Sequence, residues 1–125
     1  NDSIGNTLGE MSLIYYKFQA YEDDDCDVLM IDQPEDNISN NRIAEKLIQY
    51  LNQTRKQKQL ILVTHNPLLV VNLDADNVIA LNKNNNVIQV SAGCLEDEEN
   101  KILDIVAKTL DGGKEMIEKR LKIYE

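Results

Sequence analysis

The sequence predicts an α/β fold with parallel core strands, an antiparallel edge hairpin and C-terminal helices. Two short runs, residues 26–31 and 60–64, are almost continuously apolar, as strands buried in a parallel sheet are. Segments with apolar residues at helical spacing precede and follow these runs. Two further β-prone runs flank the asparagine-rich residues 82–86, which is typical of a hairpin. This order of elements favours a parallel core with an antiparallel edge.

The first predicted elements are a helix and a strand. Residues 9–21 carry an apolar set broad enough for a well-buried helix, and the acidic residues 22–25 end it in a solvated turn. In the run at 26–31 only Asp27 is polar, so we expect a strand buried on both faces. Pro34 ends that strand.

A loop, a second helix and a second strand follow. Residues 35–41 are polar, and residues 41–56 predict a helix with Asn40 or Asn41 as its N-cap. Its apolar face consists of Ile43, Ala44, Leu47, Ile48 and Leu51. The strand at 60–64 comes next, and a short helix over 68–73 follows the loop at 65–67.

The last third of the chain predicts a hairpin and two helices. Residues 78–81 and 87–90 form the hairpin strands. The carboxylates of 96–99 suit the first turn of the next helix, because the helix dipole favours negative charge there. Its apolar face consists of Ile102, Leu103, Ile105, Val106 and Leu110. Gly112 and Gly113 break this helix, and residues 114–124 predict a final one.

Composition limits the class of protein and its surroundings. The 125 residues fit one domain or a large piece of one, and Asn1 is an unusual first residue, which favours a piece. No apolar run approaches the roughly 20 residues of a membrane span. Cys26 and Cys94 are isolated, so we expect buried thiols in a reducing cytoplasm and no zinc site. A net charge of −9 disfavours DNA or RNA binding by this chain itself.

Polar residues follow both predicted core strands. Asp32 comes directly after an apolar strand, which is where α/β sheets place ligand chemistry. His65, the single histidine, comes directly after the second strand. If the strands are parallel neighbours, both residues emerge at the same edge of the sheet. Ser3 and Gly5 precede the first helix, where backbone N–H groups suit an anionic phosphate. Taken singly, each feature also has an ordinary structural explanation as a capping or loop residue.

The order of these motifs resembles that of ABC-type ATPase heads of chromosome-maintenance and DNA-repair proteins. The string IDQPED at 31–36, with THN at 64–66, is most similar to TrlF-type AAA-like ATPases. The similarity covers nearly the whole chain and implies a partial P-loop NTPase fold of the ABC type. It also implies that ATP and Mg²⁺ are the ligands and that two heads dimerise.

The resemblance implies a role for each matching residue. Ser3 and Gly5 would form the signature loop, which touches the γ-phosphate of a nucleotide held by a partner head. Asp32 would be the Walker B aspartate that serves magnesium, and His65 the switch histidine at the γ-phosphate. Asn40 lies in the stretch that corresponds to the D-loop at the dimer interface.

The sequence departs from this family pattern at two positions. Gln33 stands where a glutamate usually polarises the attacking water, and a neutral amide cannot accept a proton. Glu35 or Asp36 is then expected to take that role. Ser39 replaces the usual D-loop aspartate, so the interface contacts of that loop are in question.

The phosphate-binding loop GxxxxGK[ST] does not occur in the sequence. We therefore expect residues 1–125 to be the C-terminal segment of one ATPase head, whose remaining part supplies that loop. ATP and Mg²⁺ would bind only with that part present, and this segment alone would be inactive. The resemblance makes DNA a possible partner of the parent through other segments; no membrane partner is expected.

Two alternatives remain open at this stage. One is a non-catalytic module that keeps the ATPase fold for interaction or dimerisation, which Gln33 and Ser39 favour. The other is a receiver-like signalling domain that uses Asp32, Thr64 and Lys83. The acidic residues 23–25 lie only a few residues before Asp32, whereas a receiver places them one helix and one strand earlier.

Overall fold

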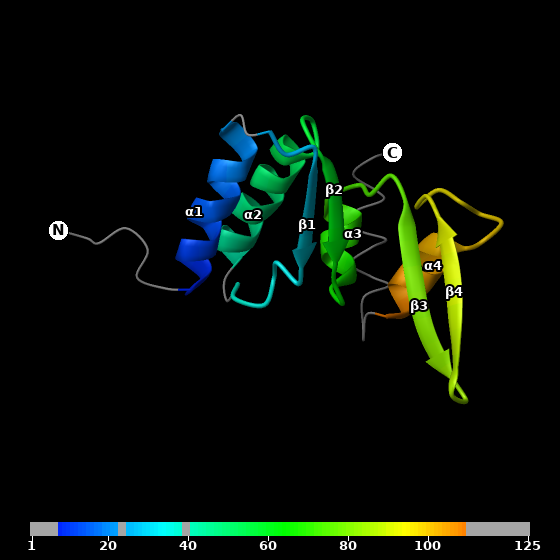
Figure 1. Cartoon of the computed structure of the whole chain (residues 1–125). Coiled ribbons are helices and arrows are strands. Elements are labelled where there is room, and N and C mark those ends of the chain that lie inside the picture. The colour runs from blue at the N-terminus through cyan, green and yellow to red at the C-terminus, as the bar shows by residue number, and fades with distance from the viewer. Residues whose placement is uncertain (1–7, 23–24, 39–40, 110–125) are drawn as a thin grey trace. The chain divides into compact units, whose positions relative to one another are not determined.

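The computed structural model describes residues 8–22, 25–38 and 41–109 (Figure 1). The chain divides into two compact units, Asn1–Thr64 and His65–Glu125. The first unit contains α1 (Leu8–Tyr21), β1 (Val28–Asp32), α2 (Asn41–Thr54) and β2 (Gln59–Val63). The second contains α3 (Pro67–Asn72), β3 (Val78–Asn84), β4 (Val87–Gly93) and α4 (Ile102–Lys108). The chain is therefore mixed α/β, as the sequence predicts.

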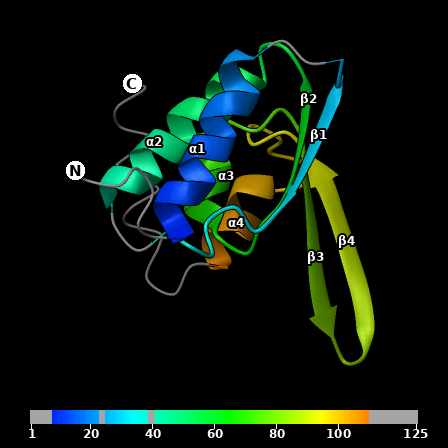
Figure 2. The ribbon, with the colours of Figure 1, turned by 60° about the vertical axis from the view of Figure 1, so that its left-hand side comes forward.

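The first unit is built on a two-stranded parallel sheet. β1 and β2 pair with Val28 opposite Gln59 and Asp32 opposite Val63. α2 connects them, as parallel strands require a crossover. α1 and α2 lie side by side in both views (Figures 1 and 2). The predicted parallel pairing of the two apolar strands is confirmed.

The core of the first unit lies on one face of this sheet. Along β1, Leu29 and Ile31 are buried, whereas Val28 and Met30 are exposed, Met30 by 67%. The helices contribute the remaining buried apolar side chains: Leu13, Tyr16 and Ala20 from α1, and Leu47 and Leu51 from α2. The prediction of a strand buried on both faces is therefore wrong, since the buried side chains of β1 alternate with exposed ones.

α1 is also less buried than its apolar composition predicts. It buries one narrow face, and the following apolar side chains are exposed: Leu8, Met11, Ile14, Tyr15, Phe18 and Tyr21. The prediction of a well-buried helix is wrong because only the face formed by Gly9, Leu13, Tyr16 and Ala20 is packed. Apolar side chains all around a helix allow every side of the helix to be buried. The elements that pack against the helix decide how much of its surface is buried.

In the second unit, the hairpin is present and longer than predicted. β3 and β4 pair antiparallel from Val78 opposite Gly93 to Asn84 opposite Val87. Asn85 and Asn86 make the turn with φ values of 47° and 61°, a conformation that asparagine tolerates and two-residue hairpins favour. The hairpin forms a sheet of its own in the described part of the chain, not an edge of the β1–β2 sheet.

The helices of the second unit begin at different signals. Asn66 caps α3, because its side chain accepts a hydrogen bond from the backbone N–H of Leu68, and Pro67 takes the first helical position. α4 begins only at Ile102, so the prediction that residues 96–99 form its first turn is wrong. Asp97 instead accepts two hydrogen bonds from Asn100, which holds this segment in a turn.

A small apolar cluster holds α4 to its own unit. Its buried members are Leu95, Ile102 and Val106, and Val70, Val71, Val78 and Leu103 pack against them.

Other predictions have different outcomes. The expected Leu110, the Gly112–Gly113 break and the final helix at 114–124 lie outside the described residues. Cys26 and Cys94 are exposed, so the expectation of buried thiols is wrong. None of the described helices has the length and apolar character that crossing a bilayer requires.

Candidate functional site

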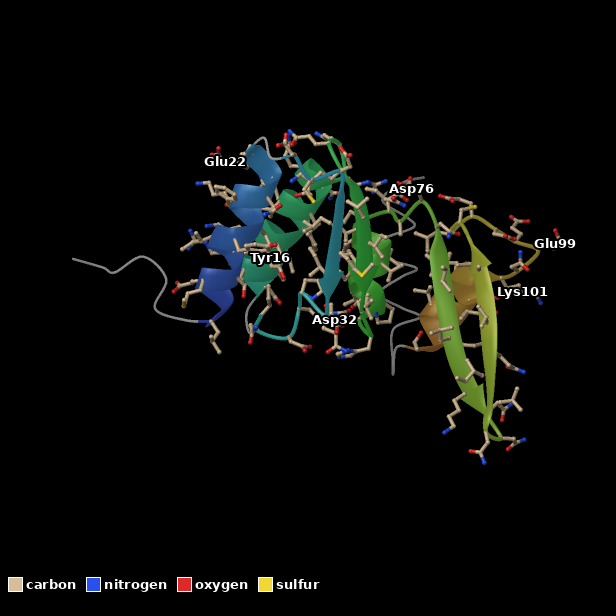
Figure 3. All side chains as sticks on the ribbon, viewed as in Figure 1. Tyr16, Glu22, Asp32, Asp76, Glu99 and Lys101 are labelled. Carbon is tan, nitrogen blue, oxygen red and sulfur yellow. The ribbon has the colours of Figure 1, made fainter. Side chains whose placement is uncertain are left out.

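The candidate site lies at the carboxyl edge of the β1–β2 sheet. Because Asp32 is the last residue of β1 and pairs with Val63, the last residue of β2, the segments that follow both strands start at the same edge. The Asp32 side chain is exposed at this end of β1 (Figure 3). The sheet therefore brings one predicted magnesium residue together with the residues after β2.

A tight turn follows Asp32 and positions the next side chains. The backbone N–H of Gln33 donates to the Val63 carbonyl at 2.7 Å, so this residue is still attached to β2. Its φ of 48° lies in the left-handed region, which turns the chain away from the sheet. Two further bonds close the turn, from Asp36 N to Gln33 O at 3.2 Å and from Ile38 N to Glu35 O at 2.9 Å.

Glu35 is held by the residue that follows β2. The hydroxyl of Thr64 donates a hydrogen bond to Glu35 Oε1, and both side chains are half-buried. A carboxylate held in this way keeps further acceptor positions, because each carboxylate has about four lone-pair sites. The turn with the predicted base is thus hydrogen-bonded to the residue that directly follows β2.

Gln33 has a different partner. Its amide, oriented to satisfy its hydrogen bonds, donates from Nε2 to Asp36 Oδ2 at 2.7 Å and to Oδ1 at 3.2 Å. The amide N–H groups are therefore directed at a carboxylate within the same turn. The two neighbouring candidates for the residue that handles the attacking water therefore have different partners. Glu35 contacts Thr64, whereas Gln33 contacts Asp36.

Tyr16 is a side chain of α1 on which Glu35 acts electrostatically (Figure 3). Its side chain is 8% exposed. Burial raises the pKa of the Tyr16 hydroxyl, and the neighbouring Tyr15 and the Glu35 carboxylate raise it further. The charge of Glu35 is therefore close enough to act on a buried side chain of α1. The sequence places Tyr16 on the core face of its helix, but no local pattern links it to Glu35.

The structure brings some of the predicted site residues together, and others lie elsewhere or outside the described residues. Asp32, Gln33 and Glu35 lie together at the edge of the sheet. His65 is joined to Thr64 by one peptide bond and is the first residue of the second unit. Ser3, Gly5 and Asn40, predicted to contact nucleotide, and the D-loop residue Ser39 lie outside the described residues.

The sequence does not predict the contact between Thr64 and Glu35. Thr64 appears in the sequence as the end of an apolar strand, and nothing local identifies a carboxylate partner 29 residues away. The only available signal is topological, since parallel neighbours bring the ends of their strands together.

The oxygen-rich edge suits a hard divalent cation. Glu35 and Asp36 have carboxylate oxygens within 4.8 Å of one another, and Mg²⁺ prefers such oxygens over nitrogen or sulfur ligands. No protein-family model and no curated protein sequence matches this chain. The geometry of the edge and the motifs that form it therefore carry the functional argument.

Proposed function

We propose that the chain is the C-terminal part of an ABC-type ATPase head that binds and hydrolyses ATP with Mg²⁺. One observation carries the proposal: two parallel strands end together, so Asp32 and Thr64 lie at the same edge of a sheet. The carboxyl edge of parallel strands is where α/β proteins bind ligands. The phosphate-binding loop, absent from this sequence, would come from a further segment of the head.

Within this proposal, each residue at the edge has a chemical task. Asp32 would hold magnesium, usually through water, and the metal would neutralise charge on the phosphates. Glu35 would accept the proton of the attacking water. Gln33, engaged with Asp36, would support the turn or orient water without accepting a proton. His65 would contact the γ-phosphate.

The proposed parent is a DNA repair or defence ATPase of the TrlF-like type, in which heads dimerise around nucleotide. Ser3, Gly5 and Asn40 would contact the nucleotide or the partner head. The net charge of −9 disfavours DNA binding by this chain. Any DNA contacts would therefore be made by other segments of the parent. Resemblance alone suggests DNA, whereas the shared edge also supports nucleotide chemistry.

The experiment compares Glu35→Gln with Gln33→Ala in the complete head, meaning this chain together with the segment that supplies the phosphate loop. We expect Glu35→Gln to lower single-turnover ATP hydrolysis by roughly the 10²–10⁴-fold typical of losing a general base. ATP binding should survive, because Asp32 and the phosphate loop are unchanged. Gln33→Ala should have a milder effect.

Glu45→Gln is the matched control, because it makes the same chemical change at an exposed position of α2. Normal turnover in Glu35→Gln with a dead Gln33→Ala would assign the water to Gln33. Absence of hydrolysis by the wild-type head under ATP-saturating conditions would instead favour the non-catalytic module.

A further inference from the structure

We propose that Thr64 is a positioning residue that holds Glu35 in its working orientation. The inference rests on the proposed function, in which Glu35 accepts the proton of water. Thr64 directly follows β2, and its hydroxyl donates to Glu35 Oε1. The bond joins the loop after β1 to the loop after β2, so it couples the two motifs that make the edge.

The backbone around both residues is already fixed, which makes this hydrogen bond effective. Gln33 N donates to Val63 O at 2.7 Å, one residue before Thr64, and Ile38 N closes the turn onto Glu35 O at 2.9 Å. The Glu35 side chain itself has three rotatable bonds, so its direction depends on the groups that it contacts. A donor in the loop after β2 favours one of its rotamers, as a base must be aimed at the water it deprotonates.

Threonine suits this task because its branched Cβ restricts χ1 to few rotamers. The hydroxyl therefore has few directions in which it can point. The hydroxyl has one proton to donate and therefore engages one carboxylate oxygen at a time. The acceptor capacity of Glu35 is accordingly not exhausted by Thr64.

The test is made in the complete head with Thr64→Val and Thr64→Ser. Valine keeps the branched shape and removes the donor, so turnover should fall about 10- to 100-fold, the factor that corresponds to losing a hydrogen bond to a charged group. The apparent ATP affinity should stay unchanged. Serine restores the donor and should recover turnover to within a few-fold of wild type.

Thr54→Val is the matched control. It removes another threonine hydroxyl, which donates to the Tyr50 carbonyl at 3.0 Å within α2, away from the edge. Turnover should remain at the wild-type level in this variant. The double variant Glu35→Gln/Thr64→Val adds a test of mechanism, because Thr64 acts through Glu35 and should cause no further loss once that carboxylate is gone.

The outcomes separate the two proposals. Full turnover of Thr64→Val, or losses that multiply in the double variant, would overturn the role of Thr64 while Glu35→Gln still supports the ATPase. A low Thr64→Val turnover that Thr64→Ser does not recover would also overturn it, since the hydroxyl would not be the cause. Lack of hydrolysis by the wild-type head would overturn the proposed function and the inference with it.

Discussion

At the scale of single residues, hydrogen-bond partners distinguish side chains that the sequence places almost together. Gln33 follows Asp32 directly, but its φ of 48° and its contact with Asp36 tie it to its own turn. Glu35, two residues later, contacts Thr64, which directly follows β2. The order of residues after Asp32 therefore does not by itself identify the base.

Asp97 provides a residue-scale prediction of pH dependence. Asn100 donates from its backbone N–H to Oδ1 at 2.9 Å and from Nδ2 to Oδ2 at 2.7 Å. These bonds, the backbone one above all, lower the pKa of Asp97 below its usual 3.8. Since the folded pKa is depressed, the stabilisation is fully present above 3.8 and is lost as the pH falls through the lowered value.

We expect Asp97→Ala to lower the melting temperature of the chain at neutral pH. The difference from wild type should shrink as the pH falls below 3.8, because protonation removes the same interaction. Circular dichroism melts across this range measure the effect, with the exposed neighbour Glu98→Ala as control. A difference that is constant with pH would show that the carboxylate charge has no part in it.

At the scale of elements, α1 approaches the turn of Glu35 as closely as a glycine allows. Gly9 is buried, and a Cβ there would lie 2.6 Å from the backbone oxygen of Asn37. The same Cβ would be 3.8 Å from Ile43 Cδ1 of α2, an ordinary contact. The absence of a side chain at Gly9 thus determines how closely the helix packs on the turn.

Gly9→Ala is therefore expected to destabilise the chain. Alanine favours a helix over glycine by about 1 kcal/mol. The backbone oxygen of Asn37 cannot move away cheaply, and overpacking typically costs about 1–3 kcal/mol, so the clash should match or exceed the gain. Urea unfolding measures the net change, with Lys17→Ala at an exposed position of α1 as control. A clearly stabilised Gly9→Ala would show that α1 and the turn are further apart in solution.

At the scale of the whole molecule, both units expose large apolar side chains. In the first unit they include Met30 of β1 and Val63 of β2, the latter 52% exposed. In the second they lie on the hairpin: Ile79, Leu81, Val87, Ile88 and Val90. Apolar side chains exposed along a strand or hairpin are available for contacts with other protein. This exposure agrees with the proposal that a further segment completes the head.

We expect the isolated 125-residue chain to show no ATPase activity and no measurable ATP affinity. The reason is the absence of GxxxxGK[ST] from its sequence, since that loop normally supplies most of the phosphate contacts. Titration calorimetry with Mg-ATP is the measurement, and the complete head is the positive control. Micromolar binding by the isolated chain would contradict the proposed division of the site.

The elements that local sequence determines were predictable. The apolar runs set β1 and β2, the asparagines at 85 and 86 set the hairpin turn, and Asn66 with Pro67 sets the start of α3. In each case the signal lies within a few residues, because capping, turn conformation and strand pattern depend on adjacent backbone groups. The common edge after β1 and β2 followed from their predicted parallel pairing.

Only the tertiary structure decided which faces are buried and which side chains meet. Lys58, a charged residue that follows α2, is only 7% exposed, and its Nζ donates to Gln19 Oε1 of α1 at 3.3 Å. Glu35 meets Thr64, and α1 buries only one side of its apolar surface. These outcomes depend on contacts between segments far apart in the chain, whose packing is set by shape and by the choice of neighbours. Local sequence supplies the apolar and polar groups. The tertiary fold determines which of these groups are in contact, and therefore which are buried and which form hydrogen bonds.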